Sequence, residues 1–408
     1  MMTRFLPPVI ALAALMSGAV SCVYPFEVSV PSEDARLTVD GSIRVGAQTV
    51  LTLSRVIPLN GGGDYSLSFE GFIEGEDGSR VTGVPALVVP VAEEPSAGMA
   101  PPHLTLTFDT SALSDAQRYR LFLRDTGHGA EYASDWLTVH PAPVIDDLSY
   151  TPNQEEGRLD IAMTMHGGGG NRFRWSFEET WEYHADMQAR YYFDPSRIHV
   201  SGEYKPEMGI VPFPPGQNIY YCWRRYTSPG IRIFSTADQA EDRFTDLSFH
   251  QVARTDQRLQ ILYRLTVYLE ALDEQGYNYW HNIEQNSQNQ GSIFSPMPSQ
   301  MTGNIHCLTD PSAEVLGYVN AAKVAVAELY YDNGSEHFYQ AQHRTIEVVN
   351  AQPESFETLY GIGYVPYDFF AGSQAEPPAY QWLPRQCVDC RMQGGSKDKP
   401  EGWPNDHQ

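Results

Sequence analysis

Apolar and polar residues alternate in short runs along most of this sequence, and that alternation leaves few architectures open. A run of this kind places its apolar residues on one face of a β-strand, because successive side chains point to opposite sides of the chain. Clear examples are Leu37-Thr38-Val39-Asp40-Gly41 and Tyr119-Arg120-Leu121-Phe122-Leu123. Since Gly, Asp, Pro and Ser clusters separate the runs, the pattern predicts antiparallel sheets that bury one face.

The runs fall into two groups, which predicts two domains in a chain of 408 residues. Residues 36–140 hold the first group, and they indicate an N-terminal β-sandwich of the immunoglobulin or fibronectin type. His140-Pro141-Ala142-Pro143 then marks a joint, because proline cannot donate a hydrogen bond to a strand ladder. Residues 141–350 hold the second group and predict another β-sandwich-like domain.

Three features distinguish the second domain. Residues 184–218 form an insertion that is long for a structureless loop in a compact domain, so we expect a functional loop or additional strands. Residues 273–285 predict one short helix, with Asp273 as its cap and with Tyr277, Trp280 and Ile283 at every third position along one face. Residues 351–408 are rich in Pro and Gly and predict an irregular C-terminal tail packed on this domain. The expected fold class is therefore mainly β.

The N-terminus has the pattern of a lipoprotein signal peptide over residues 1–21. A positive charge precedes an apolar run over residues 5–20, which is too short and too interrupted by proline to span a membrane. Ser21 comes directly before Cys22, and lipoprotein signal peptidase needs such a small residue before the thiol that receives diacylglycerol. We expect lipidation of Cys22, with residues 22–35 as a tether. The alternative is ordinary cleavage nearby, with Cys22 as an incidental thiol.

The formal net charge of −24 limits the partners of the chain. A protein of this charge repels the phosphate backbone of nucleic acids and anionic lipid headgroups. We therefore expect no nucleic-acid partner, and a membrane contact only through the lipid anchor.

After Cys22 is set aside, an even number of cysteines is left: Cys222, Cys307, Cys387 and Cys390. An even count in an exported protein predicts two disulfides. Three pairings are possible and the sequence does not choose among them, although pairing with Cys222 or Cys307 would staple the tail to nearby strands. The alternative is a zinc site of four thiolates, but only Cys387-Val388-Asp389-Cys390 has the required tight spacing. Disulfides are favoured, and no metal site is expected.

The motifs of common catalytic sites are missing from the sequence. There is no Gly-x-Ser-x-Gly nucleophile elbow and no His-Glu-x-x-His pair. The run His166-Gly167-Gly168-Gly169-Gly170 lacks the Lys-Ser or Lys-Thr of a phosphate loop, so a hairpin turn is favoured there. Glu178, Glu179 and Glu182 offer the carboxylates of a glycosidase, but a chain with 51 acidic residues forms such clusters by chance. We expect solvated strand positions for them, and no enzyme.

Aromatic residues near the insertion are the candidates for ligand contact. Trp181, Tyr183, Tyr191 and Tyr192 would form a stacking platform for a sugar or a patch for protein contact. The other interpretation, half-buried strand residues and loop anchors, is supported at least as well by the pattern.

Several phrases occur in an order that is typical of one protein family. They are Phe173-Arg174-Trp175, Glu179-Thr180-Trp181-Glu182, Tyr221-Cys222-Trp223, Tyr277-Asn278-Tyr279-Trp280, Gly291-Ser292-Ile293-Phe294, Val315-Leu316-Gly317-Tyr318 and Cys387-Val388-Asp389-Cys390-Arg391. On these phrases almost the whole mature chain resembles the lipoprotein family called domain of unknown function 4249 (DUF4249). It departs from the family at Lys399-Pro400-Glu401-Gly402-Trp403, where an Asp-Phe-Trp ending is commoner, and at Ala19, where the lipobox more often has Leu.

The resemblance implies an outer-membrane lipoprotein of a Bacteroidota-type bacterium, on the periplasmic or cell-surface face, often produced beside TonB-dependent, SusC-like transporters. It brings no catalytic residues and no cofactor beyond the covalent lipid at Cys22, because the family has no assigned activity. Our prediction is a non-catalytic accessory or ligand-capture partner of such a transporter, with a glycan or peptide as ligand. The alternatives are a stand-alone glycan- or protein-binding adhesin-like module and, third, a hydrolase.

Overall fold

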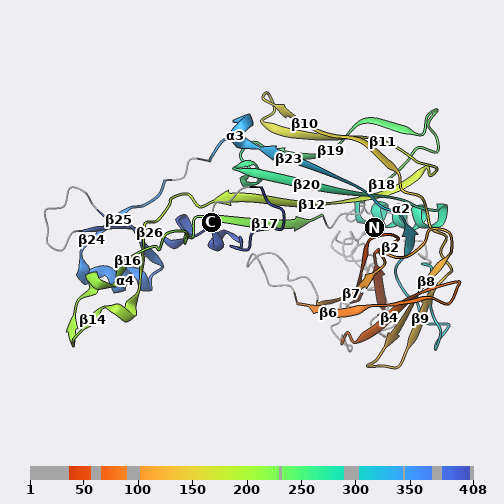
Figure 1. Cartoon of the computed structure of the whole chain (residues 1–408), viewed down its shortest axis with the longest axis horizontal. Helices are drawn as coiled ribbons and strands as arrows, with labels where there is room; N and C mark the ends of the chain where they lie inside the picture. The colour runs from red at the N-terminus through yellow and green to blue at the C-terminus, as the bar shows by residue number, and fades with distance from the viewer. Residues whose placement is uncertain are drawn as a thin grey trace, which may run out of the picture. The chain divides into compact units, whose positions relative to one another are not determined.

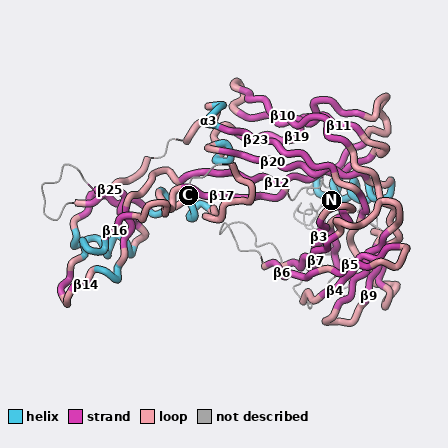
Figure 2. Tube along the Cα trace, viewed as in Figure 1, coloured by secondary structure: helices cyan, strands magenta, loops and turns pink. Residues whose placement is uncertain are grey.

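The structure is a computed structural model that describes residues 36–56, 66–89, 102–228, 232–288, 303–342, 345–369 and 379–404. The expected signal peptide, Cys22 and the tether over residues 22–35 lie outside the described residues. The described part is built mostly from antiparallel strands with a few short helices, which confirms the predicted mainly β fold class (Figure 1, Figure 2). Within those ranges, no helix combines the length and the apolar character needed to cross a lipid bilayer.

Two sheets enclose the core of the first sandwich. One sheet contains, in spatial order, β1 (Leu37–Asp40), β3 (Gln48–Arg55), β7 (His103–Asp109) and β6 (Val84–Val88). The other contains β21 (Ile305–Cys307), β9 (Glu131–Ser134), β8 (Tyr119–Asp125), β4 (Phe69–Gly75) and β5 (Arg80–Thr82). Along β8, the fully buried Tyr119, Leu121 and Leu123 alternate with more exposed residues. The period of two in the sequence thus places one face of this strand in the core.

The first core also takes residues from a distant part of the chain. β21 extends its sheet through β9, and β22 (Asn320–Ala322) pairs in parallel with β2 (Ser42–Arg44). Buried side chains of this stretch belong to the same hydrophobic cluster as β1 and β8. Although residues 141–350 resemble one second domain in sequence, the stretch 305–322 packs with the first, because tertiary packing decides which partner a short strand finds.

The second sandwich contains the longest strands. One sheet consists of β10 (Val144–Asn153), β11 (Arg158–His166) and β19 (Arg243–Ala253). The other consists of β17 (Tyr221–Thr227), β12 (Arg172–His184), β20 (Leu262–Ala271) and β23 (Ala325–Asp332), and β12 also pairs with β18 (Arg232–Ser235). The short helices η3 (Gln257–Leu259) and α3 (Asn333–Glu336) follow β19 and β23. Side chains from both sheets form one hydrophobic core, so the sheets are two layers of one sandwich.

The glycine run after β11 carries the chain from one sheet of this sandwich to the other. Because β11 and β12 lie in different sheets, the hairpin turn expected at residues 166–170 is wrong. Gly168 and Gly169 have φ angles of 60° and 112°, which favour glycine. A Cβ atom on Gly167 would lie 2.0 Å from the carbonyl oxygen of Gly170. The run therefore serves a tight crossover between sheets.

The predicted helix is present as α2 (Glu274–Gln288). Asp273 caps its first turn, because its Oδ1 accepts a hydrogen bond from the backbone N–H of Gly276 at 2.6 Å. The hydroxyl of Tyr318 donates to the same carboxylate at 2.8 Å. On the aromatic face of the helix, Trp280 is buried in a small cluster that also contains Tyr318. Capping and packing therefore act together on this element.

The insertion and the C-terminal tail pack against each other, and we call residues 187–219, 346–369 and 379–388 the insertion–tail module. The insertion contains β13 (Tyr191–Phe193) paired with β16 (Ile210–Pro212), β14 (His199–Val200) paired with β15 (Glu203–Tyr204), and the 3-10 helices η1 (Pro195–Arg197) and η2 (Pro206–Gly209). The tail forms a sheet of β24 (Val349–Ala351), β26 (Tyr380–Pro384) and β25 (Tyr364–Phe369), with η4 (Pro353–Ser355), α4 (Phe356–Gly361), η5 (Arg385–Cys387) and η6 (Cys390–Gln393). Phe193, Phe356 and Trp382 share one core. The tail is more regular than expected because the insertion offers it a surface to pack on.

Candidate functional site

A pocket of about 600 Å³ lies at an edge of the second sandwich. Its walls come from β17 and β19, the edge strands of the two sheets, and from β12, β18 and η3. The lining includes Glu179, Trp181, Arg224, Tyr226 and Arg258. Aromatic surface with a few polar groups in a concave site is typical of ligand pockets, so we take this pocket as the candidate site.

Glu179 lies on a face of β12 that otherwise carries large apolar side chains. The alternate positions on that face are buried, and they are Phe173, Trp175, Phe177, Trp181 and Tyr183. Pairing with β17 and β20 fixes the register, because Trp181 lies opposite Arg224 on one side and Tyr263 on the other. Strand parity therefore directs Glu179 inward, and 0% of its surface is exposed.

Three donors converge on one oxygen of this buried carboxylate. Glu179 Oε1 accepts from His250 Nε2 at 2.9 Å, from Arg258 Nη1 at 2.7 Å and from the Tyr263 hydroxyl at 2.7 Å. Arg258 also donates through Nη2 to Asp256 Oδ2 at 2.8 Å. The guanidinium thus joins two carboxylates, and the network connects β12, β19, β20 and η3.

The network fixes the charge states of these groups. Burial alone would raise the pKa of Glu179, but the hydrogen bond from His250 and the charge of Arg258 outweigh it, so its pKa lies below the ordinary value of 4.5. Burial would lower the pKa of Arg258, but its hydrogen bond to Asp256 and the charge of Glu179 raise it instead. Burial and the neighbouring Glu179 raise the pKa of Tyr263 well above its ordinary value. At neutral pH the site holds an ionised Glu179, a charged Arg258 and a protonated Tyr263.

Two polar atoms of pocket residues have no hydrogen-bond partner within the described part of the chain. They are Glu179 Oε2, an acceptor, and Trp181 Nε1, a donor, and both are buried. Buried polar atoms in folded proteins are nearly always satisfied, and leaving one unsatisfied costs about 1–3 kcal/mol. The described residues hold five further unpartnered atoms of this kind outside the pocket. In the pocket one donor and one acceptor belong to the same lining, where a polar ligand would satisfy both.

Two further arginines bring positive charge to the pocket. The Arg224 guanidinium lies 5.8 Å from the centre of the Trp181 ring, and that of Arg232 lies 5.7 Å from the centre of the Trp175 ring. Both side chains line the pocket, and Arg232 is exposed. The whole chain has a formal net charge of −24, so the positive charge of these arginines is a feature of this pocket and not of the protein in general.

The structure does not bring the four predicted aromatic residues together. Trp181 lines the pocket. Tyr183 is fully buried and its hydroxyl donates to the carbonyl oxygen of Cys390 at 2.7 Å, so its expected place on a ligand-facing surface is wrong. Tyr191 and Tyr192 are half-buried in β13 of the insertion–tail module, and neither belongs to the pocket lining. Their neighbours are other aromatic rings of that module.

The acidic cluster of β12 is also placed differently from the prediction. Glu178 is half-buried, but Glu179 and Glu182 are fully buried rather than solvated. Glu182 accepts a hydrogen bond from Trp403 Nε1 at 2.9 Å and so anchors the end of the tail. Burial is tolerated because each of the two carboxylates has donors within reach.

His250, Asp256, Arg258 and Tyr263 were not among the residues predicted for a site. One signal in the sequence pointed toward them, namely an acidic residue at the centre of an otherwise aromatic row with a period of two. A carboxylate at such a position needs cationic partners from facing strands. The pattern does not say which residues those partners are.

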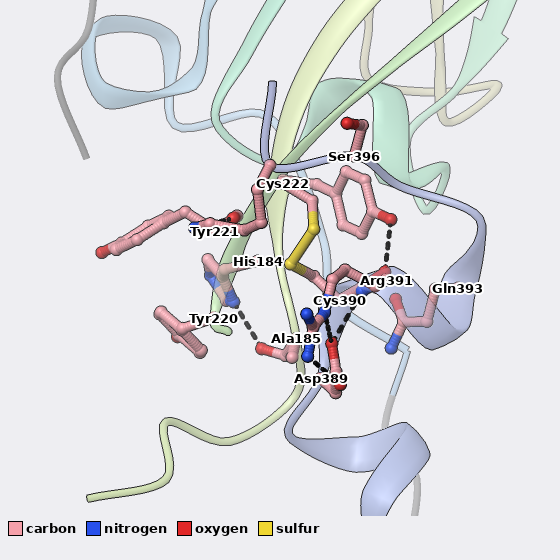
Figure 3. Close-up of a disulfide and its surroundings, with 12 residues drawn as sticks. His184, Ala185, Tyr220, Tyr221, Cys222, Asp389, Cys390, Arg391, Gln393 and Ser396 are labelled. Carbon is pink, nitrogen blue, oxygen red and sulfur yellow. Dashed lines mark hydrogen bonds and ion pairs between the residues drawn. A yellow bond between two sulfur atoms is a disulfide. The ribbon is translucent and has the colours of Figure 1, made fainter. Parts of the chain in front are cut away.

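A disulfide between Cys222 in β17 and Cys390 at the start of η6 clasps the tail to the second sandwich (Figure 3). Beside it, Arg391 Nε donates to Asp389 Oδ1 at 2.8 Å, and Nη2 of the same arginine donates to Asp389 Oδ2 at 2.8 Å. The backbone N–H groups of Trp223 and Ser396 each donate to the other residue's carbonyl at 2.9 Å. The tail is therefore stapled to the sheet through Cys222, which was one of the two partners that the sequence left open for it.

The expectation of two disulfides is wrong. Among the described residues one disulfide forms, and Cys307 is a buried thiol in the first core whose Sγ lies 3.4 Å from Thr309 Oγ1. The reason is that residues 305–307 pair with β9 rather than with the second sandwich. With Cys222 and Cys390 bonded to each other, the four-thiolate zinc alternative loses two of its ligands. Across the described ranges, no group of three or more His, Cys, Asp and Glu side chains is placed to hold a metal ion.

Comparison with known families agrees with the order of phrases in the sequence. A family model with the description Domain of unknown function (DUF4249) matches residues 23–328. The match includes β12, β17, β19 and η3, which together build the pocket, while Cys390 lies beyond the matched range. No curated protein matches the chain.

Proposed function

The chain belongs to the family described as Domain of unknown function (DUF4249), and from this premise we propose that it is an outer-membrane lipoprotein that serves a TonB-dependent transporter. In this role it is a non-catalytic accessory that captures ligand and docks to the transporter, with a lipid on Cys22 as its anchor. The family description names no activity, so the support comes from the residues of this chain.

The proposed location rests on the N-terminal sequence pattern and on the disulfide. The signal-peptide pattern that ends at Cys22 supports export and lipidation. The disulfide between Cys222 and Cys390 supports a compartment outside the cytoplasm, since cytoplasmic thiols are kept reduced.

The proposed ligand capture rests on the pocket at the edge of the second sandwich. The observation that carries it is the pair of buried, unpartnered polar atoms, Glu179 Oε2 and Trp181 Nε1. A ligand that satisfies both atoms removes their cost and is thereby held in a defined orientation.

A binding role fits the charge states of the pocket better than hydrolysis does. A glycosidase needs one carboxyl group that keeps its proton near neutral pH. Glu179 and Asp256 share the Arg258 guanidinium. In each, burial would raise the pKa, but the hydrogen-bonding and cationic neighbours hold it below its usual value. Neither residue supplies the acid.

The proposed docking rests on an apolar surface of the insertion–tail module. Tyr204, Met208, Tyr360 and Ile362 are exposed large side chains, and Ile362 is 67% exposed. The Tyr204 hydroxyl donates to Glu357 Oε2 at 2.7 Å, which ties β15 to α4. The segment η2, which carries Met208, packs against η4, and η4 leads directly into α4. We call these four residues the module patch. Apolar patches on soluble proteins often mark interaction sites.

Co-purification from detergent-solubilised outer membranes tests the proposal. The full chain with a tag after Gln408 should bring down a β-barrel transporter. The double variant Met208→Glu/Ile362→Glu should lose most of it, because two charges in an apolar interface are costly. The matched control is Leu308→Glu/Val326→Glu, which changes two exposed apolar residues outside the module patch. Recovery of the protein alone, without a barrel, contradicts the transporter role.

The second candidate function is a stand-alone surface module that binds glycan or protein, as an adhesin does. The exposed Tyr226 ring at the pocket favours it, because aromatic faces bind sugar rings. The two functions separate in a strain without the transporter. An adhesin keeps its ligand binding and its cell-surface effect there, whereas an accessory loses its physiological effect.

A further inference from the structure

We propose that the Cys387 thiol exchanges with the disulfide between Cys222 and Cys390, so that the bond moves to Cys387–Cys390 and the tail is released from β17. The inference goes beyond the proposed function and depends neither on a pocket ligand nor on the transporter. It starts from the motif Cys387-Val388-Asp389-Cys390, to which the proposed function assigns no role.

The motif contains a thiol and a disulfide-bonded sulfur three residues apart. Cys390 is bonded to Cys222 across 168 residues of sequence, whereas Cys387 is a thiol. Cys390 is fully buried, but Cys387 is half-buried and lines a second pocket of about 330 Å³. Disulfides exchange when a thiolate attacks one of their sulfurs, so a thiol beside a disulfide is the arrangement that exchange needs.

The backbone between the two cysteines brings them within bonding range. Val388 has φ −122° and ψ −16°, and Asp389 has φ −113° and ψ 102°. A residue with a nearly helical ψ followed by an extended residue approaches a type VIII turn, in which the first and fourth Cα atoms lie less than about 7 Å apart. Disulfides form at Cα separations of about 4.4–6.8 Å. A bond between Cys387 and Cys390 therefore needs no large movement of the backbone.

The carboxylate between the cysteines is bound by two arginines. Asp389 is buried, and it accepts hydrogen bonds from Arg391 Nε and Nη2, both at 2.8 Å, and from Arg385 Nε at 3.2 Å. The second pocket adds one further carboxylate, that of Asp186. Carboxylates would repel an attacking thiolate, and the two guanidinium charges balance both of them.

The exchange conserves electrons and needs neither an oxidant nor a reductant. The Cys387 thiol gives its proton to water, and the resulting thiolate attacks Cys390 Sγ. The Cys387–Cys390 bond forms as the bond between Cys390 and Cys222 breaks, and Cys222 leaves as a thiolate that takes up a proton. The three sulfurs share one disulfide and one thiol before and after the step.

The exchange replaces a long-range clasp by a local one. The present bond joins η6 to β17, whereas the new bond lies within the tail (Figure 3). Afterwards η6 stays on the sandwich through noncovalent contacts, among them the hydrogen bond from the Tyr183 hydroxyl to the Cys390 carbonyl oxygen. Gln393, which accepts hydrogen bonds from two residues of the first pocket, is then held less firmly. These contacts favour the clasp in the resting protein, and whatever pulls η6 away from β17 favours the local bond.

Thiol trapping of the mature full-length protein measures the exchange. The protein is kept without reductant near pH 8, close to the ordinary thiol pKa of about 8.5. It is then acidified, unfolded and alkylated with a maleimide, and the labelled peptides are quantified by mass spectrometry. We expect a minor state in which Cys222 is labelled and Cys387 is protected, in about 1% of molecules or more.

Variants of two buried tyrosines test whether the contacts of η6 hold the clasp. Tyr183→Phe removes the hydrogen bond to the Cys390 carbonyl oxygen and should raise the labelled share of Cys222 about fivefold. Tyr119→Phe is the matched control, because this hydroxyl donates to the Ser114 carbonyl oxygen at 2.7 Å in the first sandwich. The control should leave the share unchanged.

Cysteine variants assign the exchange to the motif. Cys387→Ser should abolish the labelling of Cys222, whereas Cys307→Ser, which removes the buried thiol of the first core, should not change it. In exported Cys222→Ser we expect the bond between Cys387 and Cys390. Trypsin then releases the peptide Gln386–Arg391 with a mass lower by two hydrogen atoms, and circular dichroism checks that the variant is folded.

Four results overturn the inference. They are no labelled Cys222 in the wild type and in Tyr183→Phe, labelling of Cys222 that persists in Cys387→Ser, labelling of Cys390 in place of Cys222, and a folded Cys222→Ser protein in which Cys387 and Cys390 both remain thiols. If Cys222→Ser does not fold, the trapping experiments on the wild type, Tyr183→Phe and Cys387→Ser decide the matter.

Discussion

Removal of the disulfide between Cys222 and Cys390 tests how the tail is held on the second sandwich. We expect the variant Cys222→Ala/Cys390→Ala to fold, because other contacts keep the tail in place. The Tyr183 hydroxyl still donates to the carbonyl oxygen of residue 390, and Ser396 still exchanges two backbone hydrogen bonds with Trp223. The main effect is therefore expected in the unfolded chain, which gains freedom when the cross-link is lost.

The size of the loss follows from the length of the closed loop. The two cysteines are separated by 168 residues. In the loop-entropy model a loop of about 100 residues gives about 4.7 kcal/mol, and the logarithmic dependence raises this to about 5 kcal/mol here. Both sulfurs are fully buried, and their removal adds roughly 1 kcal/mol at each site. We expect the free energy of unfolding to fall by roughly 5 to 7 kcal/mol.

Urea unfolding followed by tryptophan fluorescence measures this loss. Cys307→Ala is the matched control, because Cys307 is a buried thiol outside the disulfide, and we expect it to lose only about 1 kcal/mol. The wild type in a strong reductant should approach the double variant. If the double variant is no less stable than Cys307→Ala, the disulfide does not restrict the unfolded chain and the argument fails.

Three further predictions concern the buried network and the helix. Arg258→Met leaves the Glu179 carboxylate buried without its cation and should lower the free energy of unfolding in urea at pH 7 by about 3–5 kcal/mol. The control Arg225→Met should lower it little. Equal losses in the two variants would contradict the role of Arg258. Because the pKa of Glu179 lies below 4.5 in the folded protein, its contribution to stability is complete above about pH 4.5 and is lost as the pH falls further. Below that pH the urea midpoint of Glu179→Gln should therefore fall less steeply than the midpoint of the wild type. Parallel curves for the two proteins would refute this. Asp273→Ala should lower the free energy of unfolding by about 1 kcal/mol for the lost cap and further for the lost Tyr318 hydrogen bond. Asp273→Asn should retain most of the capping. Circular dichroism and urea unfolding of the two variants together check this.

Strands with a clean alternation were predictable from the sequence. His103 to Phe108 and Tyr119 to Leu123 are found within β7 and β8, and the long run around Trp175 is found within β12. Each of these strands has one face in a core, so the hydrophobic pattern and the burial pattern coincide. The helix after Asp273 was predictable for a similar reason, since its cap and its aromatic face both show in the sequence.

β19 was not predictable, although it forms a wall of the pocket. Most of its side chains are exposed or half-buried, and its pairing with β11 shifts register at two places. Each shift interrupts the period of two, so the alternation is lost. His250 lies in this strand and therefore escaped notice.

Long-range choices were the other limit of the sequence. The pairing of β2 with β22, and the location of Cys307 in the first core, both depend on strands that meet across hundreds of residues. An even cysteine count predicts oxidation but cannot tell which thiols are within reach of one another. The distance between sulfurs is a property of the folded chain, and one of the expected bridges is not made for that reason.

The segment that carries Cys390 connects the two surfaces to which we assign function. Gln393, in η6, accepts a hydrogen bond from Gln257 Nε2 at 2.7 Å through its side chain and one from Arg224 Nη1 at 3.4 Å through its carbonyl. Both donors line the pocket. The same segment continues directly from the insertion–tail module, whose patch we propose as the docking surface, and the disulfide fixes it between them. The disulfide, the hydrogen bond from the Tyr183 hydroxyl and the two backbone hydrogen bonds between Trp223 and Ser396 together hold this segment where Gln393 braces the pocket.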